Sequence, residues 1–229
     1  MGDYADFCES YGGSAGDPEF MDRWLEENVY PYDEDEEREW YLENENKPHY
    51  QLLMDQLESV DIMLDLEVPE KANFSFLVMV HAHVVSSFEG YLAGVFIHHV
   101  CNSDELTRKL VETDPEFAKR KFTLKEIYQE QDALKVTVAT YLKDLIFHDV
   151  KKIKPMYQAV LGHKFENLSW LFKAVELRHH CVHRAGYDKD GKMIDISVES
   201  VLELLGNVTD LANEIDDTID NLGSGLQTI

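Results

Sequence analysis

A long apolar stretch, residues 73–101, constrains the fold of this chain more than any other feature. Its apolar side chains are Phe74, Leu77, Val80, Val84, Val85, Phe88, Leu92, Val95 and Phe96. A helix that is apolar nearly all round must be buried, either in a protein core or in a membrane. Polar residues interrupt the stretch at His81, His83, Ser86, Ser87, Glu89, His98 and His99. Because such side chains are costly in a bilayer, we predict a central core helix here and no membrane span.

Five further segments carry helix signals, either a three- and four-residue apolar spacing or an N-terminal cap. They are residues 49–66, 104–113, 123–147, 165–184 and 198–219. Ser103, Thr123 and Ser197 fit the N-caps of the second, third and fifth segments. The lysine-rich residues 151–155 are expected to be a solvated linker, followed by a helical turn over 156–161. Without an internal repeat or a βαβ pattern, the prediction is an all-α fold.

Charge divides the chain into an N-terminal extension and a helical domain. Residues 1–48 contain sixteen Asp and Glu and three Lys and Arg, so they carry −13 of the net charge of −24. Aromatic residues recur through this extension, which we interpret as a solvated tail with a few docked turns, or as a segment that covers a basic groove or binds a partner. The helical domain is expected over 49–222 and a flexible tail over 223–229. A negative net charge repels nucleic acid at long range.

The cysteines and the N-terminus favour a cytoplasmic protein. Cys8, Cys101 and Cys181 are an odd, widely spaced set without a Cys-x-x-Cys pair, which is typical of reduced thiols and of neither a disulfide framework nor a zinc ribbon. The first residues lack the basic and apolar regions of an export signal. We therefore expect a cytoplasmic location.

The densest chemistry lies in residues 176–186, which contain Arg178, His179, His180, Cys181 and His183. On a helix, His179 and His183 share a face, whereas Arg178 and His183 point roughly 140° apart. Two copies related by a two-fold axis could combine the arginine of one with the histidine of the other. Arginine clamps phosphate oxygens and imidazole moves protons near neutral pH, so the pattern predicts chemistry on a phosphate.

Arg178 and His183, with a polar His179 directly after the arginine, resemble the Arg-x4-6-His motif of the HEPN superfamily. Glu89, beside Phe88, is similar to the acidic residue in the first helix of many HEPN domains. The resemblance covers about residues 72–222 and implies a small all-helical dimer, in many members a metal-independent ribonuclease. HEPN toxins with a nucleotidyltransferase antitoxin carry a tyrosine where this chain has Ala185, so the pattern is closer to stand-alone defence or toxin proteins.

The resemblance implies that RNA is cut by attack of a ribose 2′-hydroxyl on the adjacent phosphorus. Arg178 would hold the charge that develops on the phosphate, His183 would be the acid or base, and His179 would assist. No metal or other cofactor is needed. The implied partners are RNA, a second copy of the chain and, in a toxin or antiviral defence setting, an antitoxin or another defence protein.

Other interpretations of the same residues remain open. His179 and His183, four residues apart, could chelate zinc, although no second ligand pair has suitable spacing. The histidines could also only cap the helix and pack a dimer. Glu89 could be a satisfied core carboxylate, with Arg178 as its natural partner. The alternative function is a non-catalytic HEPN-like interaction module that binds a protein partner through its acidic N-terminal segment.

Overall fold

The computed structural model describes residues 49–119, 134–145, 147 and 149–226. The chain divides into two compact units, Met1–Trp40 and Tyr41–Ile229. All described residues belong to the second unit. This part of the chain is all-α, as predicted, and its only β-type pairing is the single bridge between Tyr187 and Met193.

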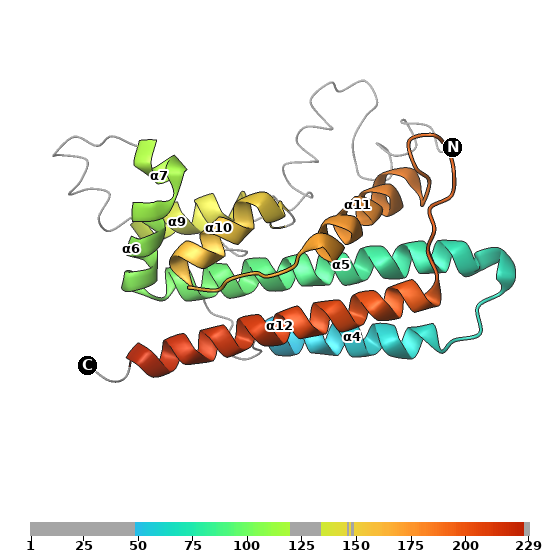
Figure 1. Ribbon diagram of the computed structural model, residues 1–229, viewed down its shortest axis with the longest axis horizontal. Helices are drawn as coiled ribbons and strands as arrows, with labels where there is room; N and C mark the ends of the chain where they lie inside the picture. Colours follow the sequence, from blue (N-terminus) through green and yellow to red (C-terminus); the bar gives the residue numbers. More distant parts are fainter. Residues whose placement is uncertain (1–48, 120–133, 146, 148, 227–229) are drawn as a thin grey trace, which may run out of the picture. The chain divides into compact units, whose positions relative to one another are not determined.

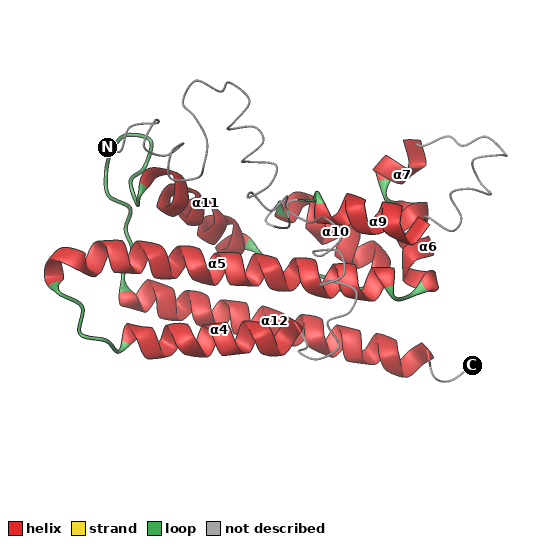
Figure 2. Ribbon diagram, turned by 180° about the vertical axis from the view of Figure 1, so that it is seen from behind, coloured by secondary structure: helices red, strands yellow, loops and turns green. Residues whose placement is uncertain are grey.

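The central element is α5 (Glu70–Cys101), a helix of 32 residues. It lies between α11 (Ser169–Arg184) on one side and α4 (His49–Leu64) with α12 (Val198–Leu226) on the other (Figure 1, Figure 2). Its buried side chains point in all directions around the axis, from Leu77 to Cys101. By length and composition α5 could cross a membrane, but its position among the other helices explains its apolar character, and the prediction of a core helix is confirmed.

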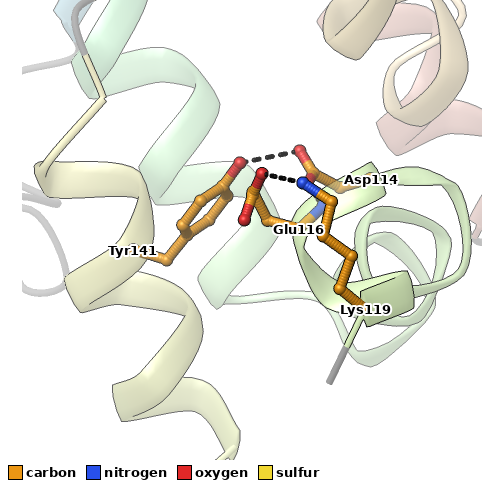
Figure 3. Close-up of polar contacts among 4 residues, drawn as sticks. All are labelled: Asp114, Glu116, Lys119 and Tyr141. Carbon is orange, nitrogen blue, oxygen red and sulfur yellow. Dashed lines mark hydrogen bonds and ion pairs between the residues drawn. The ribbon is translucent and has the colours of Figure 1, made fainter. Parts of the chain in front are cut away.

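Four shorter helices lie around the C-terminal half of α5 (Figure 1). They are α6 (Asp104–Thr113), α7 (Pro115–Lys119), α9 (Leu134–Lys143) and α10 (Val150–Val160). Of these, α6, α9 and α10 contact α5, and α7 packs on α6. Figure 3 shows the joint between α6, α7 and α9. Asp114 ends α6, and its carboxylate accepts hydrogen bonds from the Glu116 backbone N–H at 2.8 Å and from the Tyr141 hydroxyl at 2.9 Å. One carboxylate therefore fixes the turn into α7 and the approach of α9.

Buried polar groups tie the other helices to the central one. The Tyr157 hydroxyl of α10 donates to the Leu92 carbonyl oxygen at 2.6 Å, and the Tyr91 hydroxyl of α5 donates to the Ala212 carbonyl oxygen of α12 at 3.1 Å. His81 Nε2 lies 3.1 Å from the Ala174 carbonyl oxygen of α11. Each bond satisfies a group that would be costly to bury alone, so these contacts fix the positions of the helices along α5.

The expected linker over 151–155 is wrong, because these residues are helical and belong to α10. Val150, Ile153, Met156, Tyr157 and Val160 are buried at three- and four-residue intervals, which drives a helix even though Pro155 cannot donate a backbone hydrogen bond. The lysines that suggested a solvated connector form the outer face of this helix. In the sequence, the three lysines and Pro155 obscure the apolar spacing of this helix.

Several predicted boundaries change as well. α11 begins at Ser169 instead of residue 165, and α12 continues to Leu226, so its expected end near Ile219 is wrong. The N-cap predictions for Ser103 and Ser197 are confirmed: Ser103 Oγ accepts from the Leu106 N–H at 3.3 Å, and Ser197 Oγ accepts from the Ser200 N–H at 3.2 Å. The Thr123 cap and the N-terminal extension over 1–48 lie outside the described residues.

Candidate functional site

The candidate site lies in the last two turns of α11, which α5 holds in place. Leu171, Ala174 and Cys181 form the buried stripe of α11, and burial raises the pKa of the Cys181 thiol to about 11. This cysteine is therefore a packing residue at neutral pH, since the thiolate is the reactive form. The charged and imidazole side chains of the cluster occupy the rest of the helix surface.

Two consecutive left-handed residues end α11. Ala185 has φ 50° and Gly186 has φ 86°, and the Gly186 N–H donates to the His180 carbonyl oxygen at 3.0 Å. The predicted helix-ending glycine is Gly186, but the left-handed turn already starts at Ala185, which the sequence did not reveal. A Cβ on Gly186 would lie 2.7 Å from Phe74 Cζ, so only glycine lets the end of α11 sit this close to α5.

Arg178 lies on the inner side of α11 and pairs with Glu89 of α5. The Arg178 Nη2 to Glu89 Oε2 distance is 3.6 Å, and the two side chains are 22% and 17% exposed. This is the partnership expected from the sequence. The contact is longer than a good charge-assisted hydrogen bond, and the Arg178 Nε is buried without a hydrogen-bond partner among the described residues. The guanidinium thus retains hydrogen-bonding capacity beyond Glu89.

His179 and His183 lie side by side on the solvent face of α11. Both side chains are exposed, and their ring centroids are 4.7 Å apart. Loss of solvent around the ring lowers the pKa of His179, and the neighbouring His183 and Arg184 lower it further. A lowered pKa favours the neutral imidazole, which is the form that accepts a proton. The two rings are close enough to act on one bound group.

His180 and Arg184 form a pair that sequence reasoning did not anticipate. The Arg184 Nη1 donates to His180 Nδ1 at 3.0 Å. The four-residue separation of the two side chains on a helix could have revealed it. This contact places the Arg184 charge beside His180 and leaves His179 and His183 as the imidazole pair of the outer face.

Within one chain, the arginine and the histidine pair are on different sides of α11. Arg178 is turned inward to Glu89, whereas His183 is exposed, in agreement with their helical spacing. A zinc site at His179 and His183 would need further ligands, but no group of three or more His, Cys, Asp or Glu in the described residues is arranged to hold a metal ion.

A second histidine cluster lies between α4 and α5, and sequence reasoning missed it. The His49 and His98 ring centroids are 6.1 Å apart, and those of His98 and His99 are 5.2 Å apart. Burial, with a smaller contribution from the neighbouring His98, lowers the pKa of His49 and of His99 to about 4. The signal in the sequence was weak, because His49 lies 49 residues before His98 and 50 before His99.

Comparison of the chain with protein-family models, with curated protein sequences and with solved structures finds no match.

Proposed function

We propose that this protein is a metal-independent endoribonuclease of the HEPN type, which acts in a toxin or antiviral defence setting as a cytoplasmic homodimer. The observation that carries the proposal is the composition of the end of α11. A half-buried arginine with an unused buried donor lies in the same two turns of helix as two adjacent, exposed imidazoles. These are the side chains that cleavage of RNA without a metal requires.

The reaction is a transesterification within the RNA chain. The imidazole of His183, our first choice for the base, takes the proton of a ribose 2′-hydroxyl, and the 2′-oxygen forms a bond to the adjacent phosphorus. The bond from phosphorus to the 5′-oxygen of the next nucleotide breaks, and that oxygen takes a proton from a second imidazole or from water. The products are a 2′,3′-cyclic phosphate and a 5′-hydroxyl end. Arg178 stabilises the charge on the phosphate oxygens.

A second copy of the chain supplies the geometry that one chain lacks. Because Arg178 and His183 point to different sides of α11, the arginine of one copy would meet the histidines of the other across a two-fold axis. Phe172 and Val182 of α11 are 45% and 52% exposed, and they provide apolar surface beside His179 and His183 for such a contact.

The test is cleavage of a labelled RNA by the purified protein in EDTA. His183→Ala and Arg178→Ala should each lower the rate at least about 100-fold, since each removes a group that acts in the transition state. His180→Ala is the matched control, because His180 lies in the same turn but pairs with Arg184; it should retain activity. If the wild-type protein cut RNA without leaving a 2′,3′-cyclic phosphate end, or if EDTA fully inhibited it, the mechanism would be contradicted.

Two observations favour the alternative, a non-catalytic HEPN-like interaction module that binds a protein partner through its acidic N-terminal segment. Arg178 has a structural role available to it in the partly buried pair with Glu89, and the net charge of −24 opposes RNA binding. In this case no form of the protein cleaves RNA, while Arg178→Ala lowers stability and His183→Ala changes neither stability nor dimerisation.

A further inference from the structure

A groove runs between α11 and α12, away from the arginine and histidines of the candidate site. It consists of two adjacent hollows of about 290 and 440 Å³, which share the side chains of Trp170 and Asn207. α11 and α12 each pack on α5, and the groove opens between them. We call this feature the α11–α12 groove. Hollows of this size are large enough to take several side chains of a ligand.

The smaller hollow is strongly acidic, and we call it the acidic half. Glu166, Asp210 and Glu214 line it and are exposed, and within the described part of the chain none of these three carboxylates forms an ion pair with another residue. A positive group that entered this hollow would meet three negative charges and no competing cation. The acidic half therefore favours a cationic side chain.

The larger hollow, which we call the apolar half, has mixed walls. Leu177 and Leu204 contribute apolar surface, while Lys173 and Glu203 carry opposite charges at its rim. The net charge of this half is therefore close to zero. Its walls suit a large apolar side chain, and a cationic group gains less here than in the acidic half.

Trp170 lies where the two halves meet. The centroid of its ring lies 6.3 Å from that of Phe88 in α5, and the two ring planes make an angle of 41°. The indole therefore packs against the core on one side. A partly exposed indole beside carboxylates is a favourable surface for the guanidinium or ammonium group of a ligand. Asn207 lies at the same junction and offers an amide to the backbone of a bound peptide.

We propose that the α11–α12 groove binds a short extended segment of a partner protein, with basic side chains in the acidic half and a large apolar side chain in the apolar half. Asp210 and Leu204 are six residues apart on α12, which is about 9 Å along the helix. An extended peptide covers this distance in about three residues. The recognised pattern is therefore one or two basic residues followed or preceded, about three residues away, by a large apolar residue. None of the groove residues belongs to the candidate site, so this proposal is independent of RNA cleavage.

The test measures binding of a labelled peptide to the full-length protein by fluorescence anisotropy at physiological ionic strength. The probe is the amidated hexapeptide Arg-Arg-Ser-Ser-Leu-Leu. The groove variant Glu166→Gln/Asp210→Asn/Glu214→Gln should bind it about tenfold more weakly than the wild type. The matched control is Glu58→Gln/Asp61→Asn/Glu67→Gln, which removes the same charge from exposed positions of α4 and the loop after it and should change affinity less than about twofold.

Peptide variants and a polyamine complete the test. Replacing both leucines of the probe by serine should weaken binding severalfold, because the apolar half is left empty. If the groove variant and the control variant lost the same amount of peptide affinity, the proposal would be overturned, since diffuse attraction to a protein of charge −24 would then explain the binding. Equal binding of the leucine and serine peptides, or spermine binding as tightly as the peptide, would overturn the assignment to a protein segment. Absence of binding would also overturn it.

Discussion

Two clusters of three histidines in this domain have opposite environments. His179 and His183 at the end of α11 are exposed and lie next to arginines. In the cluster of His49, His98 and His99, burial lowers the pKa of two members to about 4. The residue type is the same, but burial keeps His49 and His99 neutral near pH 7, whereas the rings of His179 and His183 are open to a ligand. The comparison shows that environment, more than composition, decides which histidines are candidates for chemistry.

The buried cluster also shows which of two electrostatic effects is larger. His98 and His99 lie in the last turn of α5, where the helix dipole favours a positive charge by about 0.3–1 kcal/mol. A shift from the ordinary value of 6.5 to about 4 has the opposite sign and corresponds to a larger free energy, because each unit is about 1.4 kcal/mol. At His99 desolvation therefore outweighs the dipole, and this ring is neutral at pH 7.

The largest predicted effect is a loss of stability in weak acid that comes from the buried cluster alone. Below pH 6.5 the unfolded chain protonates His49 and His99, while the folded chain does so only near pH 4. The unfolded state binds more protons in this window, so stability falls as the pH drops from 6.5 to about 4. Between pH 7 and pH 5 we expect a loss of about 1–2 kcal/mol for each histidine, measured by urea unfolding.

Protonation of the many carboxylates acts in the opposite direction, because it relieves repulsion in a chain of charge −24. The comparison therefore uses variants. His99→Gln should flatten the dependence of the unfolding free energy on pH between 5 and 7, whereas His183→Ala, which removes an exposed ring, should change it much less. If His183→Ala flattened the profile as much as His99→Gln, the distinction between a buried and an exposed cluster would fail.

The packing around the buried cluster gives the next largest effect, through Gly94→Ala. A Cβ on Gly94 would lie 2.6 Å from His49 Cε1 and 2.8 Å from His49 Cγ, so the imidazole ring must move. Overpacking of this kind costs about 1–3 kcal/mol, and the better helix propensity of alanine returns up to about 1 kcal/mol. We expect a net destabilisation of about 1–2 kcal/mol in thermal or urea unfolding.

Gly90→Ala is the matched control in the same helix. An added Cβ there has nothing within 4 Å, so the helix propensity of alanine should stabilise the protein by about 0.5–1 kcal/mol. Opposite signs at two glycines four residues apart would confirm that His49 fills the space over Gly94. A stabilising Gly94→Ala would show that the His49 ring moves aside at little cost and that the cluster is loosely packed.

The sequence predicted the exposed cluster better than the buried one, for a physical reason. Arg178, His179 and His183 are close in sequence, and helical spacing alone determines which of them share a face. His49 meets His98 only because α4 folds back along α5, and this contact depends on the register of two helices. The pairing of Glu89 with Arg178 was predicted because a buried charge needs an opposite charge.

The fold shows the same contrast between features set by local sequence and features set by the packing of distant segments. The core helix and the all-α class follow from the apolar pattern of residues 73–101, which leaves few alternatives. The linker predicted over 151–155 failed because Val150 and Ile153 start a buried stripe that three lysines and Pro155 conceal. The α11–α12 groove was not predicted, since Trp170 and Asp210 become neighbours only when two helices pack on a third.

The smallest predicted effect concerns the end of the exposed cluster. Ala185 adopts φ 50° and is exposed, and a left-handed conformation costs an alanine about 1–2 kcal/mol more than a glycine. Glycine also gains freedom in the unfolded chain, which offsets about 0.4–1 kcal/mol. Ala185→Gly should therefore stabilise the protein by about 0.5–1 kcal/mol, measured as a rise in the urea midpoint at constant slope. Gly186→Ala should destabilise it, because the new Cβ would meet Phe74 and Val78. If Ala185→Gly lowered stability instead, the left-handed turn would have to begin at Gly186 and not at Ala185.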